Sequence, residues 1–317
     1  MAIMSVKAHR SMATNWTYQF KITNKNAGQT IKQTFELWLL PQRIRGALRI
    51  KKNYLVNGHK VPTSYELQVN DVLNLRFDAD DFRTSESHYK PNNAQSVVIV
   101  FETDDFVIAN KPAGMKMHPH TLTEDDTLLN YLAADFSRRQ LVSAGVMARP
   151  YMVHRIDRET SGAVIIAKNP VVVPILNRML ADKQIKRTYL AWVDGKITGS
   201  FGTINRPIGV DSDDSRKRAV NGIDARTAIT HWTRIHSVFQ KTLLRLQLET
   251  GRMHQIRVHL AAIGHPIIGD SLYGNTVGTV RMMLHATSIE LTIPFGGDTK
   301  IISTAVPADF PRQLSMQ

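Results

Sequence analysis

Cysteine is absent from all 317 residues of the sequence. Its absence excludes disulfides, thiolate zinc sites and cysteine nucleophiles, and it suits a reducing compartment. Any metal site would have to use histidine and carboxylate ligands. The chain also lacks an apolar run near the roughly 20 residues that span a bilayer, so we do not expect an integral membrane protein.

Several common sequence signals are missing as well. The opening segment, "MAIMSVKAHRSMATNWTYQF", has no continuous apolar stretch, so it predicts no secretory signal and favours a cytoplasmic location. No P-loop lysine signature and no GxGxxG motif occurs, which leaves nucleotide cofactors without support. HExxH is also absent, and His254 and His259 are five residues apart rather than the four that place two imidazoles on one helical face. We therefore expect a reaction without metal or cofactor.

Acidic residues are few relative to basic ones. The chain has 27 acidic against 40 basic residues, a formal charge of +13, which attracts polyanions such as RNA, DNA or an anionic membrane surface. Its composition, 43% hydrophobic and 21% charged, is that of a globular protein. The length favours one large domain with a smaller one, or two of moderate size.

Residues 78–94, "DADDFRTSESHYKPNNA", are polar and show no apolar periodicity, which is typical of a linker. Before them, Ile31, Phe35 and Leu39 predict a helix, and Asn57-Gly58 predicts a turn between two strands. We predict a small basic α/β module over residues 1–77. Its basic stretch at residues 43–52 contains no acidic residue to pair with the cations, which weakens the alternative of a merely solvated helix face.

Strands dominate residues 95–317, which we predict to be the second domain. Two strands are expected within residues 96–112, and helices at 127–139 and 170–185. Further strands are expected at 163–167, 188–195, 228–235, 243–250 and 285–294, with 188–195 central because it is apolar on both faces. Consecutive strands without regular helical crossovers favour a mixed, mainly antiparallel sheet in an α+β fold.

The segment "VHRIDRETSGAVIIAKN", residues 153–169, places Asp157 between Arg155 and Arg158, before an apolar strand. Nearby positive charge favours the ionised carboxylate, which suits a nucleophile or base. A structural ion pair is the alternative. Residues 160–162 predict a close approach to the strand, with hydroxyls that satisfy loop amides and orient the carboxylate.

A second segment, "ETGRMHQIRVHLAAIGHPIIGDSLYG", covers residues 249–274. The apolar spacing predicts a helix from Gln255 to Ile263, which ends at Gly264. His254 and Arg257 are three residues apart and are expected to project together, with Arg252 just before the first turn. Such a helix start is a candidate anion contact, and an ordinary surface helix is the alternative.

Together, "HRIDRETSG", "KRTYLAWVDG", "GRMHQIRVHLAAIGHPIIGDSLYG" and "MLHA" closely resemble the RluA family of RNA pseudouridine synthases. "NKPAGMKMHP", residues 110–119, resembles that family's first motif. The resemblance covers about residues 95 to 295. Residues 1–77 more loosely resemble the S4-like RNA-binding module that precedes many such domains, although "PQRIRGALRIKK" replaces its usual arginine-rich helix.

The resemblance implies the pseudouridine synthase fold, with an active cleft along one side of a central, mainly antiparallel sheet. It implies that Asp157 is the catalytic aspartate, Tyr189 the active-site tyrosine and Arg257 the basic partner of the aspartate. Without it, Tyr189 would be read as a core aromatic. Arg155 matches an arginine that helps to replace the target base, and Leu284 matches a residue of a motif that lines the pocket. Further RNA or substrate contacts are expected from His154, Lys111, Arg252 and His254.

The expected function is therefore isomerisation of uridine to pseudouridine in RNA, with ribosomal RNA as the expected partner, no membrane, no cofactor or metal, and a monomeric enzyme. The carboxylate of Asp157 would bond to C1′, stabilise positive charge there, or remove a sugar proton. Two other functions remain open. One is a non-catalytic RNA-binding factor of ribosome assembly with the same fold, and the other is a histidine-dependent metallohydrolase.

Overall fold

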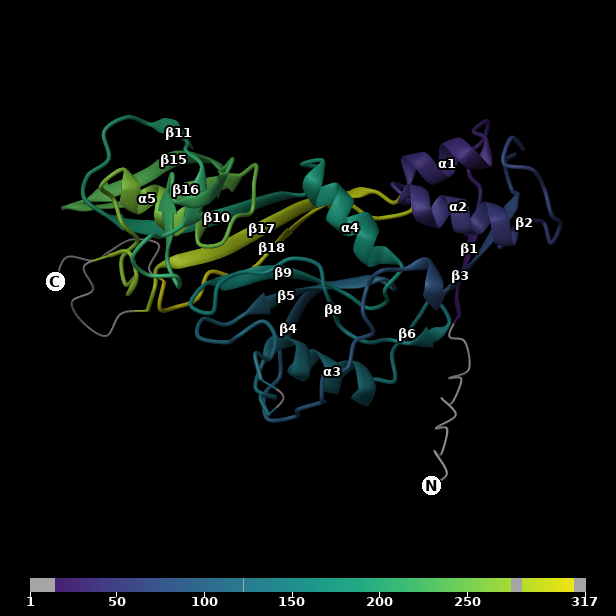
Figure 1. Cartoon of the computed structure of the whole chain (residues 1–317), viewed down its shortest axis with the longest axis horizontal. Coiled ribbons are helices and arrows are strands. Elements are labelled where there is room, and N and C mark those ends of the chain that lie inside the picture. The colour runs from purple at the N-terminus through teal and green to yellow at the C-terminus, as the bar shows by residue number, and fades with distance from the viewer. Residues whose placement is uncertain (1–14, 122, 275–280, 311–317) are drawn as a thin grey trace, which may run out of the picture.

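The computed structural model describes residues 15–121, 123–274 and 281–310, which form a small N-terminal module beside one large sheet (Figure 1). Within these ranges, no helix has the length and apolar character that a membrane span needs.

The N-terminal module has a three-stranded antiparallel sheet in the order β1-β3-β2, with two helices. Its elements are β1 (Asn15–Lys21), α1 (Ile31–Leu37), α2 (Gln42–Lys51), β2 (Tyr54–Val56) and β3 (Val72–Asp78), followed by the 3₁₀ turn η1 (Ala79–Asp81). Thr30 caps α1 in a reciprocal pair with Gln33. The predicted turn is confirmed, because Asn57 and Gly58 both have positive φ and Val56 and His59 exchange backbone hydrogen bonds of 2.9 Å.

A ten-stranded sheet forms the rest of the core. Its main order is β11-β15-β16-β10-β17-β9-β5-β4, with β18 added to β17 and β8 to β9. The strands are β4 (Val98–Glu102), β5 (Phe106–Lys111), β8 (Tyr151–Met152), β9 (Ser161–Ala167), β10 (Lys186–Asp194), β11 (Phe201–Asn205), β15 (Ile229–Val238), β16 (Lys241–Leu248), β17 (Leu284–Thr292) and β18 (Thr299–Ser303). Every described pair is antiparallel except β9 with β17. The predicted α+β fold with a mixed, mainly antiparallel sheet is confirmed.

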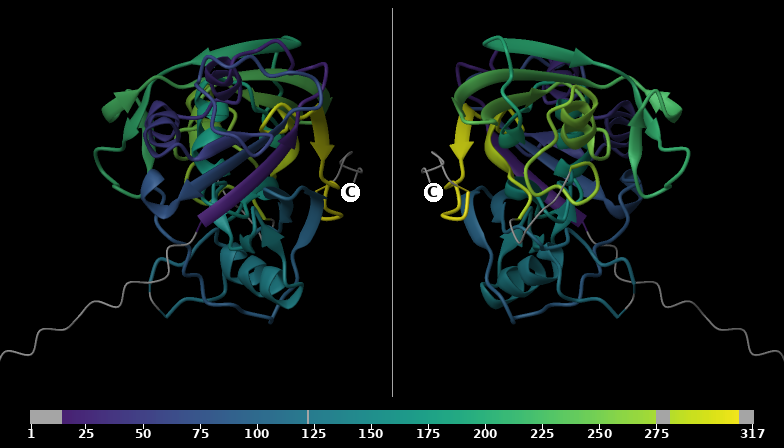
Figure 2. Two further views of the ribbon diagram at one scale, coloured as in Figure 1. Left: turned by 90° about the vertical axis from the view of Figure 1, so that its right-hand side faces the viewer. Right: turned by 90° about the vertical axis from the view of Figure 1, so that its left-hand side faces the viewer.

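Helices and short strands surround this sheet. They are α3 (Leu128–Arg138), α4 (Val172–Ala181), α5 (Gln255–Ala262), the hairpin β6 (Val142–Ser143) with β7 (Val146–Met147), and a small sheet of β12 (Ile208–Val210), β13 (Arg218–Val220) and β14 (Ile223–Arg226). All three predicted helices of this domain occur, shifted by a few residues at their ends. In Figure 1 and in both views of Figure 2, α3 lies on the opposite side of the molecule from β11.

The predicted central position of residues 188–195 is confirmed. β10 pairs with β16 on one side and with β17 on the other, and Trp192 and Val193 are fully buried. A strand covered on both faces has to be apolar on both faces. This strand therefore provides a rigid support for side chains that project from its start.

The N-terminal module packs directly against one end of the large sheet. Phe295, beyond β17, contacts the rings of Tyr18, Phe20 and Trp38 at centroid distances of 4.9, 5.1 and 5.5 Å. The Tyr18 hydroxyl donates to Asp105 Oδ1 at 2.6 Å, and burial, with the charge of Asp105, raises the Tyr18 pKa. Residues of the module, α4 and the sheet share one buried cluster, so the module has a defined orientation.

Residues 78–82 pack on the N-terminal module, and residues 86–92 lie against the large domain. Ser87 Oγ donates to the Pro150 carbonyl at 2.7 Å, and Asn130 Nδ2 donates to the Lys90 carbonyl at 2.8 Å. Arg149 adds an ion pair to Glu86 at 2.6 Å. The division of the chain at this segment stays a prediction, and its path is set by these contacts.

The cations of α2 were expected to have no acidic partners, but two of them form ion pairs with acidic residues of other elements. Arg45 pairs with Glu36 of α1, while Lys51 pairs with Asp78 at 2.9 Å and Asp81 at 2.7 Å. The expectation was wrong because it considered only neighbours in sequence, and folding brings acidic residues from other elements to the helix. Less of the positive charge is therefore free to meet a polyanion.

Gly162 confirms the close approach predicted at residues 160–162. Its φ is 112°, and a Cβ there would lie 2.1 Å from the carbonyl oxygen of Ala286 in β17. We expect Gly162→Ala to lower the free energy of unfolding by at least about 3 kcal/mol, because the parallel β9·β17 pair would have to separate. Urea titration measures the loss. Gly58→Ala is the control, since Gly58 also has positive φ but open space around it, and should cost only about 1 kcal/mol. Equal losses would contradict the close-approach explanation.

Candidate active site

A pocket of about 290 Å³ lies where the loop before β9 meets β10, β17 and the start of α5. It is lined by His154, Arg155, Ile156, Asp157, Thr160, Arg187, Tyr189, Leu248, residues 251–257 and Leu284. The structure thus brings eight of the nine predicted site residues to one cavity, and Lys111 is the exception.

Asp157 and Arg257 form the polar centre of this pocket. Arg257 Nη1 donates to Asp157 Oδ2 at 3.2 Å. The guanidinium is only 2% exposed, whereas the carboxylate is 21% exposed, so Asp157 faces the cavity and Arg257 holds it from behind. Arg257 reaches this position because α5 begins at Gln255 and its first turn points at the loop before β9.

A second carboxylate, Asp270, fixes the arginine. Arg257 donates through Nε and Nη2 to the two oxygens of Asp270, both at 2.7 Å, and the ring of Tyr273 lies 5.2 Å from the guanidinium carbon. Burial alone would lower the pKa of Arg257, but the hydrogen bonds and charge of Asp270, together with Asp157, raise it above its ordinary value. Burial alone would raise the pKa of Asp270, but the hydrogen bonds to Arg257 and the charge of Arg257 outweigh burial and lower that pKa. Both groups are therefore charged at neutral pH.

Sequence reasoning missed Asp270, although it lies within the quoted second motif. The residue follows Arg257 by 13 positions, beyond the end of α5 and a turn. No helical or strand periodicity relates such positions. The signal available in the sequence was an acid shortly after the apolar residues 267 and 268, in a motif rich in cations.

The arginines that flank Asp157 in sequence do not form its ion pair. Arg158 Nε donates to the Gly114 carbonyl at 3.1 Å, and Arg155 is exposed at the pocket mouth. The Ser161 hydroxyl, expected to satisfy a loop amide, instead bonds His285 Nδ1 at 2.9 Å. Asp157 is oriented by a backbone turn, in which Thr160 N donates to the Asp157 carbonyl at 3.1 Å, and by Arg257.

Two predicted histidines line the pocket in their neutral form. His154 Nε2 accepts the Ile165 backbone N–H at 3.1 Å, and burial lowers the pKa of His154 to about 3. His254 precedes α5 in a left-handed conformation, its Nδ1 lies 2.8 Å from the Tyr273 hydroxyl, and burial lowers its pKa too. Neither imidazole is thus a cation suited to phosphate at neutral pH.

Tyr189 and Leu284 supply the apolar wall. Tyr189 on β10 is opposite Leu246 of β16 and Ala286 of β17, and it is 5% exposed. Burial raises its pKa, so the phenol is neutral. Leu284 begins β17 and is 4% exposed. A flat aromatic ring and an aliphatic side chain beside a carboxylate suit a planar base attached to a sugar.

Lys111 does not reach the pocket. Its Nζ is fully buried and donates to the carbonyls of Pro112, Met115 and Arg158 at 2.9, 2.8 and 3.0 Å, and burial lowers its pKa to about 7. The expected RNA contact of Lys111 is therefore wrong in this structure, because every amine hydrogen already has a protein acceptor. The residue instead ties the loop after β5 to the loop that carries Asp157.

Residues 105–262 match the family described as RNA pseudouridylate synthase, and residues 18–73 match the RluD ribosomal pseudouridine synthase N-terminal domain. A Bacillus subtilis protein described as an uncharacterized RNA pseudouridine synthase is 34% identical over 275 residues, which cover 84% of this chain and 89% of that protein. The chain belongs to the RNA pseudouridine synthase family. Asp157, Tyr189 and Arg257 all lie inside the matched catalytic segment.

Two further comparisons support this family assignment. The ribosomal large subunit pseudouridine synthase D of Nitrosomonas europaea is 36% identical over 315 residues, which cover 94% of this chain and 87% of that protein. The structure of human RNA pseudouridylate synthase domain containing 1 superposes with a TM-score of 0.55 and 26% identity, over 69% of this chain and 86% of that one. The resemblance to pseudouridine synthases is confirmed.

Metal chemistry finds no support in the donor set of this synthase. Within residues 15–121, 123–274 and 281–310, no three or more histidine, aspartate or glutamate side chains are placed to hold one metal ion. His118 and His120 lie close, with ring centroids 5.2 Å apart, but they are only two. The metallohydrolase alternative therefore has no site in the described part of the chain.

Proposed function

We propose that this synthase isomerises uridine to pseudouridine in ribosomal RNA, in the cytoplasm and as a monomer, with Asp157, Tyr189 and Arg257 around the reacting nucleoside. The observation that supports it is the Asp157 carboxylate, open to a pocket on one side and held by buried Arg257 at 3.2 Å on the other. Relatives named for the ribosomal large subunit support the choice of RNA.

The reaction breaks the C1′–N1 bond, turns the uracil and joins C1′ to C5. C5 loses a proton and N1 gains one, so no atom is gained or lost overall and no cofactor is required. An ionised carboxylate beside C1′ would bond to it or stabilise positive charge there, as glycosidase carboxylates do. Removal of a sugar proton is the third role that a carboxylate in this position fits.

Arg257 holds the carboxylate in one orientation. Charge-assisted hydrogen bonds are stronger than neutral ones, so this contact positions the Asp157 side chain firmly. Tyr189, neutral and held between two strands, would stack on the uracil and assist removal of the C5 proton late in the reaction.

The target nucleotide has to leave its stack to enter the pocket, which costs a few kcal/mol. Arg155 is exposed at the mouth, and its guanidinium is free to occupy the place that the base leaves. RNA contacts outside the pocket would offset the rest of the cost. Arg252 at the mouth is a second such cation.

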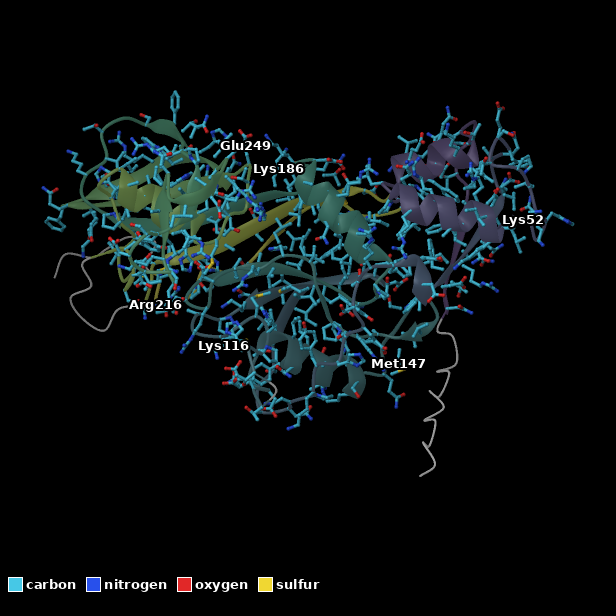
Figure 3. The ribbon with its side chains drawn as sticks, in the orientation of Figure 1. Lys52, Lys116, Met147, Lys186, Arg216 and Glu249 are labelled. Atoms are coloured by element: carbon cyan, nitrogen blue, oxygen red, sulfur yellow. The ribbon has the colours of Figure 1, made fainter. Side chains whose placement is uncertain are left out.

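The proposed domains are an RNA-binding module at residues 1–77, a connecting segment at 78–94 and a catalytic domain at 95–317. Lys52 on the module and Arg216 on the large domain lie toward opposite ends of the long axis (Figure 3). Because the module is docked in one orientation, an RNA that contacts both has to extend along the molecule.

The test is release of tritium from ribosomal RNA labelled at uridine C5. Wild type should release the label to water in the presence of EDTA, and binding should weaken steeply with salt as phosphate contacts release counterions. Tight RNA binding without release would instead favour the non-catalytic assembly factor. Pseudouridine mapping in cells that lack the protein then identifies the uridine.

A further inference from the structure

Arg187 is a cation in the pocket that the proposed chemistry does not use. It lies on β10 two residues before Tyr189, so both side chains project from the same face of the strand. It lines the same pocket as Asp157, and it is half-buried.

The other cations nearby already have partners. Arg257 bonds two carboxylates, and Lys186, on the other face of β10, pairs with Glu290 at 2.7 Å. Arg187 forms no ion pair with any residue that the structure describes, and its Nε is buried without a hydrogen-bond acceptor. A buried donor without an acceptor is destabilising, so the fold holds this guanidinium in place despite a loss of stability.

Gly251 provides the space for the guanidinium. A Cβ at Gly251 would lie 3.2 Å from Nη1 and 3.4 Å from Nη2 of Arg187. Gly251 itself is exposed, so the terminal nitrogens of Arg187 lie near the pocket mouth, on the side where Arg252 also lines the cavity. The result is a fork of N–H donors that meets no anion among the residues that the structure describes.

We propose that Arg187 binds a backbone phosphate of the target nucleotide when that nucleotide enters the pocket. This inference rests on the proposed function, because it assumes RNA in the cavity. A guanidinium fork matches two phosphate oxygens, and the anion supplies the charge that the protein does not. Asp157 is not that anion, since Arg257 already binds it and the sugar would cover it.

The first test compares Arg187→Gln with the matched control Lys186→Gln. Both lose one charge from adjacent positions, but only Arg187 faces the pocket. Arg187→Gln should weaken RNA binding and raise KM about tenfold or more, while kcat at saturating RNA stays within a few-fold. The slope of log K against log salt should become less negative by about 0.7 to 0.9, the change expected when the protein binds one phosphate fewer, and Lys186→Gln should leave it unchanged. Arg187→Lys should keep the slope but recover only part of the affinity.

The second test replaces the phosphate at the target nucleotide by a neutral methylphosphonate. Wild type should lose about tenfold in affinity, and Arg187→Gln should lose almost nothing further, because this variant no longer binds that phosphate. Gly251→Ala, whose Cβ would shift the guanidinium by a few tenths of an ångström, should also weaken RNA binding by wild type and add nothing to Arg187→Gln. Circular dichroism and urea titration check that each variant is folded.

If the affinity losses from Arg187→Gln and from the methylphosphonate were fully additive, the proposed phosphate contact would be overturned. A kcat defect of Arg187→Gln with unchanged RNA affinity and an unchanged salt slope would overturn it as well. Tritium release by wild type is read separately on the unmodified RNA. If wild type shows this coupling between Arg187 and the phosphate but releases no tritium, the proposed function is contradicted and the phosphate contact of Arg187 remains supported.

Discussion

Asp157→Asn is expected to reduce tritium release from uridine C5 by at least about 1000-fold, to the background of the assay. The amide has nearly the shape of the carboxylate but carries no charge. It can neither attack C1′, nor stabilise positive charge there, nor remove a sugar proton. All three roles that fit the carboxylate therefore predict the same loss.

RNA affinity of the same variant should stay within severalfold of wild type. Asp157 is an anion in a basic pocket, so removing its charge takes away no phosphate contact and slightly lowers repulsion. Asp298→Asn is the control, an exposed carboxylate whose partner Lys25 is 3.7 Å away, and it should release label as wild type does. Label released at an undiminished rate by Asp157→Asn would remove this residue from the reaction.

Local patterns in the sequence predicted most of the fold. Seven of the ten strands of the large sheet follow from apolar runs, whereas β8, β11 and β18 were not predicted. The two helices at residues 128–138 and 172–181 follow from spacing such as that of Leu128, Leu132 and Phe136. These features depend on neighbours within one element. The small sheet at residues 208–226 was not predicted, because its strands of three or four residues are too short to show alternation.

Motifs and a resemblance predicted the residues of the candidate site, but they did not predict the contacts that hold these residues in place. The bonds of Arg257 to Asp270, of Lys111 to the Arg158 carbonyl and of α2 to acids in other elements all join positions with no periodic relation. The docking of the module through Phe295 is of the same kind. Such pairs are set by tertiary packing, which one sequence does not display. The structural ion pair of Asp157 with Arg155 or Arg158, kept open as an alternative on charge alone, does not form, which shows how nearness in sequence misleads.

Asp270→Asn is expected to lower kcat about 100-fold without changing RNA affinity. Asp270 does not line the pocket, and its two bonds of 2.7 Å fix the plane of the Arg257 guanidinium. With an amide there, one of these bonds is lost and the arginine can turn toward Asp157 or away from it. Asp270 would thus be a positioning residue, and Asp270→Glu should restore part of kcat because it keeps the charge.

The same substitution should also destabilise the fold by about 3 to 5 kcal/mol, since it leaves a buried charge partly uncompensated. Leu132→Ala separates the two effects. Leu132 is fully buried on α3, outside the pocket, and its loss should cost a similar amount, about 2 to 5 kcal/mol. Assayed at a temperature where urea titration shows both variants folded, Leu132→Ala should keep the wild-type kcat. If both variants lost kcat equally, the effect of Asp270 would be one of stability, and the orientation of Arg257 would not limit the reaction.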